Sequence, residues 1–193
     1  MRQALRPSLA ALAALAAAAA LLAGLQLVLP AAASAQPPMP KPGPEVQKLG
    51  YLAGSWEGES EAKAGPMGPG GKMHTTQSCE WFAGGFFVVC RTKYTGGMGT
   101  VESMSEFGYD AAAKVYTYHS VNNFGETESA TGTVTGDTWT WSFEIQMGPR
   151  KLASRYVSTL ASPASYTYRV ESQMDGSAWT SFLEGTLHKV ASK

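Results

Sequence analysis

The chain has 193 residues, with 15 Lys and Arg against 15 Asp and Glu, and its formal net charge is zero. A chain without a basic excess has no field to hold a polyanion, so a nucleic-acid partner is not expected. The length suits one domain with a hydrophobic core of its own.

The first 35 residues have the pattern of a secretory signal peptide. Arg2 and Arg6 precede an apolar run over residues 9–29, and residues 33–35 form a small-residue cleavage site. The run is long enough to span a bilayer, but its many alanines make it only mildly hydrophobic. We therefore expect cleavage, export to the periplasm or cell exterior, and no stable membrane anchor afterwards. The remaining 158 residues would carry 13 basic and 15 acidic side chains.

A proline-rich segment follows, with five prolines in residues 36–44. Such a composition favours extended polyproline conformation, so we interpret it as a linker before a single domain over residues 45–193. A short helical turn is expected over residues 45–52. Beyond it, β-branched and aromatic residues alternate with polar ones, and turn signals recur. We expect about ten strands, over residues 56–62, 73–82, 86–95, 101–109, 115–123, 126–134, 137–147, 150–160, 165–174 and 177–190.

The connections between these strands are short, which predicts that each strand pairs with the next in antiparallel fashion. Ten such strands in an open sheet would leave two exposed edges, and closure into a barrel removes them. The sequence therefore predicts an all-β fold, an antiparallel up-and-down barrel of about ten strands. A sandwich of two sheets is the alternative.

Cys79 and Cys90 flank a glycine pair, Gly84-Gly85, that suits a tight turn. If these glycines are the central turn residues, counting outwards along the two strands places Cys79 opposite Cys90. Opposed residues have Cα atoms about 4.5–5.5 Å apart, a separation that a disulfide accepts. Disulfides also persist in exported proteins. We therefore predict a cross-strand disulfide between Cys79 and Cys90, with two buried free thiols as the alternative.

Aromatic residues are the first candidates for a binding site. Trp139, Trp141 and Phe143 share one face of a predicted strand and would line the interior of a barrel. Trp56 stands at the head of the first strand, where it would plug the closed end. In a barrel with room inside, the same residues form the wall of an apolar cavity. Tyr118 joins this predicted ligand site if its side of the strand is inward.

Four polar residues are candidate anchors for the polar group of a ligand. His119 and Asn123 share one face of their predicted strand and lie in the cavity if that face is inward. Arg155 and Arg169 also fall within strands. An inward guanidinium would bind a carboxylate, whereas an outward one would only add solubility. The sequence leaves both orientations open.

Four segments occur in an order that carries a resemblance to a known family. They are LGYLAGSWEG over residues 49–58, WFAGGF over residues 81–86, FGYD over residues 107–110, and a closing Asp175-Gly176 hairpin turn. Together they resemble the bacterial family catalogued as domain of unknown function 1579. The resemblance implies a calycin-like barrel, similar in shape to lipocalins and to haem-binding nitrobindins, and it implies no activity. The chain departs from the family pattern in its two cysteines and in its last strand.

The three histidines are His74, His119 and His188, and their spacing matches no zinc motif, so no metal site is predicted. His188 lies in the last strand, broadly where nitrobindin-like barrels place a haem-ligating histidine. We expect no cofactor, and haem bound through His188 or His119 is the alternative that this resemblance implies.

The sequence favours an exported barrel that binds a small hydrophobic or amphiphilic molecule. No catalytic residue is assigned, because no G-x-S-x-G element or other nucleophile motif is present. An enzymatic hypothesis, for a lyase, isomerase or hydrolase, needs His119 to meet a carboxylate such as Glu126 or Glu128 in one pocket. A third hypothesis is a structural role for an empty barrel.

Overall fold

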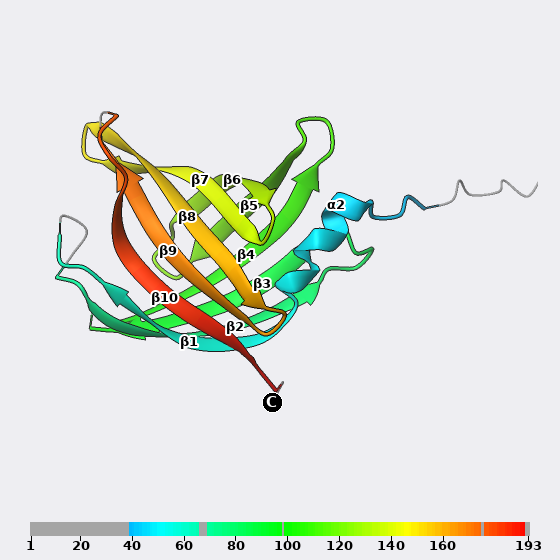
Figure 1. Cartoon of the computed structure of the whole chain (residues 1–193), viewed down its shortest axis with the longest axis horizontal. Coiled ribbons are helices and arrows are strands. Elements are labelled where there is room, and N and C mark those ends of the chain that lie inside the picture. Colours follow the sequence, from blue (N-terminus) through cyan, green and yellow to red (C-terminus); the bar gives the residue numbers. More distant parts are fainter. Residues whose placement is uncertain (1–38, 66–68, 98, 175, 192–193) are drawn as a thin grey trace, which may run out of the picture. The chain divides into compact units, whose positions relative to one another are not determined.

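A computed structural model describes residues 39–65, 69–97, 99–174 and 176–191 of the chain (Figure 1). The predicted signal peptide over residues 1–35 lies outside these residues. Residues 39–43 have no regular secondary structure, and the helical turn expected over residues 45–52 is present as α2 (Pro44–Gln47) and the 3₁₀ helix η1 (Lys48–Tyr51). In the described part of the chain, no helix has the length and apolar character needed to cross a lipid bilayer.

Ten strands follow, at the places that alternation and turn residues predict. They are β1 (Gly54–Ala62), β2 (Gly71–Trp81), β3 (Val88–Gly96), β4 (Gly99–Asp110), β5 (Val115–Asn122), β6 (Thr127–Thr135), β7 (Thr138–Met147), β8 (Arg150–Ser162), β9 (Ser165–Gln173) and β10 (Thr180–Val190).

The sheet closes into a barrel because β1 pairs with β2 on one side and with β10 on the other. All neighbours are antiparallel, and the strand order follows the chain, as predicted. Gly58 permits the closest approach of β1 and β10, because a Cβ at this position would overlap the backbone carbonyl of Thr186. The closed barrel confirms the predicted fold and excludes the two-sheet sandwich.

The last hairpin differs from the prediction. Strand β10 begins at Thr180 instead of Ser177, and Thr180 pairs with Ser172. The register then shifts between Ser181 and Leu183. The predicted two-residue turn included Asp175, which lies outside the described residues. The connection between β9 and β10 is therefore longer than a two-residue turn, and a bulge restores the inward alternation of β10.

One end of the barrel is filled by the segment that precedes β1. Leu49 and Leu52 are buried there against Trp139. The indole Nε1 of Trp56 donates to the carbonyl oxygen of Leu52 at 2.7 Å, and the Trp56 side chain is 1% exposed. On the barrel wall, the Tyr116 hydroxyl donates to the Glu45 carboxylate at 2.8 Å. These contacts fix α2 and η1 as a plug, and they leave the opposite end as the route to the interior.

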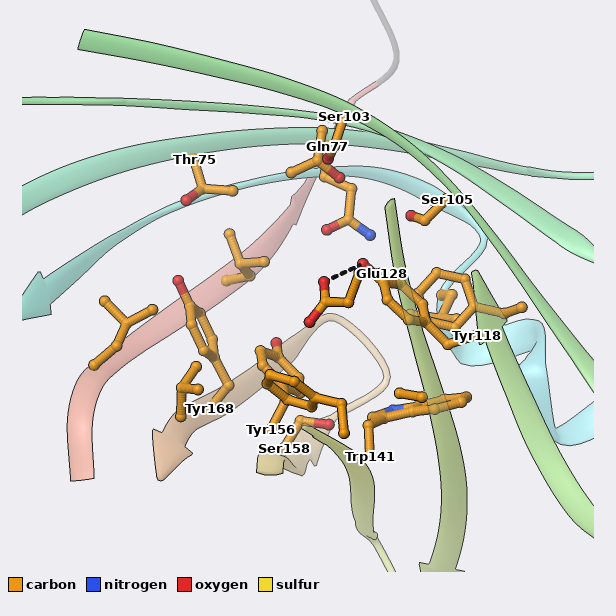
Figure 2. Close-up of a pocket in the computed structure, with 18 of the residues that line it drawn as sticks. Thr75, Gln77, Ser103, Ser105, Tyr118, Glu128, Trp141, Tyr156, Ser158 and Tyr168 are labelled. Carbon is orange, nitrogen blue, oxygen red and sulfur yellow. Dashed lines mark hydrogen bonds between the residues drawn. The ribbon is translucent and has the colours of Figure 1, made fainter. Parts of the chain in front are cut away.

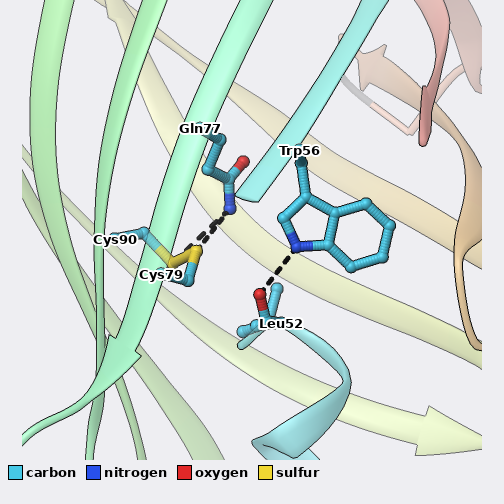
Figure 3. Close-up of a disulfide and its surroundings, with 5 residues drawn as sticks. All are labelled: Leu52, Trp56, Gln77, Cys79 and Cys90. Carbon is cyan, nitrogen blue, oxygen red and sulfur yellow. Dashed lines mark hydrogen bonds between the residues drawn. A yellow bond between two sulfur atoms is a disulfide. The ribbon is translucent and has the colours of Figure 1, made fainter. Parts of the chain in front are cut away.

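Cys79 and Cys90 form the predicted disulfide, with a Cα–Cα distance of 4.1 Å (Figure 3). The hairpin register places Trp81 opposite Val88 and Cys79 opposite Cys90, as the glycine pair predicts. Both cysteines are buried at the plugged end, within the same hydrophobic cluster as Leu52. The bridge therefore links β2 to β3 on the inner face of the barrel.

We expect the Cys79–Cys90 bridge to stabilise the folded protein by about 2–3 kcal/mol, because it closes a short loop in the unfolded chain. Urea unfolding of oxidised protein, compared with protein refolded under reductant, measures this difference. A double variant, Cys79→Ala with Cys90→Ala, should resemble the reduced protein. The disulfide would be ruled out by two alkylatable thiols in denatured protein that has never met a reductant.

Candidate functional site

A cavity of about 330 Å³ lies inside the barrel, next to the plug (Figure 2). It exists because the plug fills only one end of the barrel. The inward side chains of β2, β3 and β4 face those of β7, β8 and β9 across the remaining space. The two halves of the wall differ in chemistry, and this difference defines the site.

Aromatic rings form the wall built by β7, β8 and β9. Trp141 and Phe143 point inward from β7, Tyr156 from β8 and Tyr168 from β9. The rings of Tyr156 and Tyr168 are stacked with centroids 5.1 Å apart, and Trp141 meets Phe107 edge to face at 5.2 Å. Such packing holds each ring in one orientation and presents a rigid apolar surface to the cavity.

Gly132 of β6 determines where the Trp141 indole lies. The two residues are paired across the strands, and a Cβ at Gly132 would lie 2.7 Å from the indole ring. The missing side chain therefore lets the ring lie against the backbone of β6, out of the cavity centre. A larger residue at this position would push the indole into the space that a ligand needs.

The wall built by β2, β3 and β4 carries hydroxyl and amide groups. Gln77 points inward from β2 and its amide donates to Cys79 Sγ at 2.8 Å, so the disulfide helps to orient it. Thr75 also belongs to this wall, but its hydroxyl oxygen is buried and has no hydrogen-bond partner among the described residues. A buried hydroxyl without a partner costs about 1–3 kcal/mol. Ser158, on β8, lies beside the phenol of Tyr51 at the plugged end. The other polar side chains of this wall are Thr92, Ser103 and Ser105.

Glu128 is the single carboxylate on the described lining, and no Lys, Arg or His accompanies it there. It enters from β6, between the aromatic and the hydroxyl walls, and accepts a long hydrogen bond of 3.5 Å from the Tyr118 hydroxyl. Its side chain is exposed, but the neighbouring side chains of the wall take away part of the hydration of its carboxylate. This desolvation raises the pKa of Glu128, and the charge of nearby Glu126 raises it further, against the opposing effect of Tyr118.

Tyr118 remains a neutral hydrogen-bond donor at all ordinary pH values. Burial raises the pKa of its phenol to about 12, and the charge of Glu128 acts in the same direction. Burial also raises the pKa of Tyr94, which lines the cavity from β3. The cavity therefore has one ionisable group that titrates near neutral or acidic pH, and that group is Glu128.

Of the aromatic residues predicted for the site, three line the cavity and two are buried beside the plug. Tyr118, Trp141 and Phe143 face the cavity. Trp56 and Trp139 are buried at the plugged end of the barrel, at 1% and 2% exposure, where they pack against Tyr166 and Tyr51 respectively. The segment before β1 reaches the cavity through Tyr51 and Leu52, whereas these two tryptophans do not line it.

His119 and Asn123 were candidate anchors on the condition that their face of the strand is inward, and the structure places both side chains off the cavity lining. Tyr116 and Tyr118 point inward from β5, so His119, which follows Tyr118, points outward. Its Nδ1 is 2.9 Å from Ser129 Oγ on the outer face. Asn123 lies in the turn after β5, where its side chain accepts from the backbone N–H of Glu102.

Arg155 and Arg169 were the other expected anchors, and they too lie on the outer face. Both donate through Nε to Glu171, at 2.6 and 2.8 Å. The Arg155 guanidinium also lies 4.1 Å from the ring centre of Trp179. The two arginines therefore belong to an ion-pair cluster that ties β8, β9 and the connection to β10 together outside the barrel.

The outward histidines also correct two further hypotheses. The enzymatic version required His119 to meet Glu128, but these side chains lie on opposite faces of the sheet. Glu126 lies in the β5–β6 turn, bound to the Asn122 amide at 2.7 Å. His188 follows the inward Leu187 and is exposed, so its side chain, like that of His119, lies outside the cavity. Across the described ranges, no three His, Cys, Asp or Glu side chains gather as a metal ion would require.

Sequence reasoning missed the hydroxyl wall and the position of Glu128. A signal for Glu128 is present in β6, where Ala130, Gly132 and Val134 alternate with threonines. Small and apolar residues at every second position mark the inward face, and Glu128 continues that series. The hydroxyl wall has no such signal, because Ser and Thr occupy both faces of β2 and β4.

We expect Glu128→Gln to raise the melting temperature at pH 7 to 8, because the folded state then no longer holds an ionised carboxylate away from water. A raised pKa in the folded state means that the wild-type protein is most stable when Glu128 is protonated. The advantage of the variant should therefore shrink as the pH falls towards 4. Thermal unfolding across this range tests the expectation. Glu106→Gln, on the exposed outer face of β4, is the matched control, and an equal shift in both variants would contradict it.

Comparison with known proteins is consistent with this fold. No curated protein shows significant similarity to the chain. The crystal structure of Rv2717c from M. tuberculosis matches with a TM-score of 0.54 and 16% sequence identity, over 78% of this chain and 100% of that one. A designed fluorescence-activating β-barrel matches with a TM-score of 0.40 and 16% identity, over 74% of this chain and 96% of the design. The sequence profile described as "Protein of unknown function (DUF1579)" matches residues 41–189. The chain therefore belongs to the DUF1579 family, as its ordered motifs predict.

Proposed function

We propose that this protein binds a small amphiphilic molecule inside its barrel. The observation that carries the proposal is the cavity of about 330 Å³ with an aromatic wall on one side and a hydroxyl wall on the other. Small-molecule sites commonly have volumes of about 300–1,000 Å³ and are mostly apolar with a few oriented polar groups. The cavity lies at the small end of this range, so its ligand is a compact molecule.

The two walls suggest how such a molecule would lie. Its apolar part would pack against Trp141, Phe143 and Tyr156, where burial of apolar surface contributes about 25 cal/mol per Å². Its polar part would face Gln77, whose amide group points into the cavity. Entry would be from the end opposite the plug.

The site is preformed, which favours binding over an empty structural barrel. The disulfide joins β2 to β3, and the Trp56–Leu52 hydrogen bond fixes the plug below the cavity. A rigid wall loses little conformational entropy when a ligand arrives, so more of the contact energy appears as affinity.

We also propose that the protein is exported. Residues 1–35 have the pattern of a signal peptide, and the Cys79–Cys90 disulfide is the kind of bond that forms in oxidising compartments. Both observations point to a working protein that begins near residue 36.

The ligand proposal predicts that a neutral apolar probe binds in the barrel. N-phenyl-1-naphthylamine should gain fluorescence with a Kd below about 100 µM, because its rings fit an aromatic cavity. Ala130→Phe, which fills the cavity from β6, should weaken binding at least tenfold. Ala153→Phe, on the exposed outer face of β8, is the matched control and should leave binding unchanged.

Ser103→Phe fills the cavity from a different strand, so a folding defect in Ala130→Phe does not leave the test undecided. Circular dichroism checks the fold of each variant. Absence of probe binding to the wild-type protein, or equal binding to all three variants, would overturn the proposal.

The export proposal predicts a mature N-terminus at Gln36. Protein recovered from the periplasmic fraction or medium of its own host should yield this end on N-terminal sequencing. A chain that starts at Met1 and stays in the cytoplasm would contradict export and cleavage together.

A further inference from the structure

Among the described residues that line the cavity, the charged side chain is a carboxylate, that of Glu128. Glu128 brings a carboxylate into the space between Gln77 and Tyr118, and Figure 2 shows it directed into the cavity from β6. No Lys, Arg or His of the described chain lines the cavity, so this carboxylate has no cationic partner there. An anionic ligand would meet repulsion from Glu128, whereas a cationic one would find a counter-ion.

The surrounding rings favour the same sign of charge. Tyr94, Tyr118, Tyr156 and Tyr168 line the cavity around Glu128, and an aromatic face attracts a cation within about 6 Å of its centre. The phenols of Tyr94 and Tyr118 stay neutral, because burial raises their pKa values. They therefore add ring faces and hydroxyl oxygens to the site without adding negative charge.

Polar side chains beside Glu128 supply the remaining contacts. An alkylammonium group has three N–H donors and no acceptor. One N–H would bind the Glu128 carboxylate, and the others would meet the hydroxyl oxygen of Tyr118 and the amide oxygen of Gln77, which line the same space. The body of the ligand would lie against Trp141 and Phe143. Carboxylate, polar side chains and aromatic wall thus match the parts of an arylalkylamine.

We propose that the cavity selects organic ammonium ions with an aromatic or apolar body, with Glu128 as their counter-ion. This inference rests on the proposed ligand-binding function and narrows it to one class of ligand. The desolvation that raises the pKa of Glu128 supports it, because an ammonium ion beside the carboxylate would compensate for the hydration that the carboxylate loses in the folded protein.

Three probes of one shape and different charge test the inference. They are 1-naphthylmethylamine, which is a cation at pH 7.5, the neutral 1-naphthylmethanol, and the anion 1-naphthoate. Calorimetric titration of the wild-type protein should show at least tenfold tighter binding of the amine than of the alcohol, and the weakest binding for the naphthoate. Raised salt should weaken the preference, because the Glu128 side chain is exposed and salt screens its charge.

Glu128→Gln isolates the role of the charge, because it keeps the shape of the side chain. The variant should lose at least tenfold in affinity for the amine and change its affinity for the alcohol by less than threefold. Glu106→Gln removes a carboxylate from the outer face and should leave all three affinities as they are. The probe series on the wild-type protein remains decisive if Glu128→Gln does not fold.

The outcomes separate this inference from the proposal on which it rests. If the alcohol binds but the amine binds no more tightly, the ammonium preference is overturned and the binding function stands. If none of the naphthalene probes and no N-phenyl-1-naphthylamine binds, both are overturned. A strong preference for the naphthoate would also overturn the ammonium class, since it would mean that Glu128 does not govern the charge of the ligand.

Discussion

The hydrogen-bonded pairing of β1 with β10 turns a ten-stranded sheet into a closed barrel. Gly58 makes the approach of these strands possible, because any side chain there would overlap the Thr186 carbonyl. Closure gives every strand an inside and an outside, and the cavity consists of whatever side chains the pleat directs inward. It also removes both free sheet edges, which would otherwise invite pairing with other chains. The plug then divides the interior into a packed end and a hollow end.

The packed and hollow ends carry different physical tasks. At the packed end, Trp56, Leu49 and Trp139 are almost fully buried and supply the apolar burial that a barrel of this size needs. At the hollow end, the partly desolvated carboxylate of Glu128 works against stability, as does the buried, unpartnered hydroxyl of Thr75 in the wall. Polar groups whose hydration is not fully replaced are typical of functional sites, where some stability is lost in favour of recognition.

Much of the architecture could be predicted from the sequence, because its signals are local. Alternation located the strands, and the Gly84-Gly85 turn set the register that brings Cys79 opposite Cys90. Which face of a strand points inward is not a local signal, because it depends on how the sheet closes into the barrel. In β5, one face carries Tyr116 and Tyr118 and the other carries Thr117 and His119, and both faces look acceptable inside a barrel. The aromatic face points inward, because Tyr116 and Tyr118 pack there against Trp139 and Trp141 of β7.

The outer arginines illustrate the same limit. Arg155 and Arg169 could have served as anchors inside, but Glu171 on the outer face of β9 pairs with both. It lies two residues from Arg169 on the same face of β9, and it meets Arg155 only in the observed register of β8 and β9, where the two residues are directly opposite. For Arg155, a charged partner on the neighbouring strand decides the orientation, and the sequence of one strand taken alone does not show that partner. The placement of Glu128 inside had a local signal, in the small residues that share its face of β6.

The position of the disulfide has a consequence for how long the oxidised form survives. The sulfur atoms belong to side chains that are 5% and 1% exposed, on the inner face of a closed wall and against the plug. Thiol–disulfide exchange requires an attacking thiolate to reach a sulfur atom in line. A small reductant outside the barrel cannot do so until β2 and β3 separate from the plug. The lifetime of the bridge is therefore set by the opening rate of the barrel and not by the reduction potential of the surroundings.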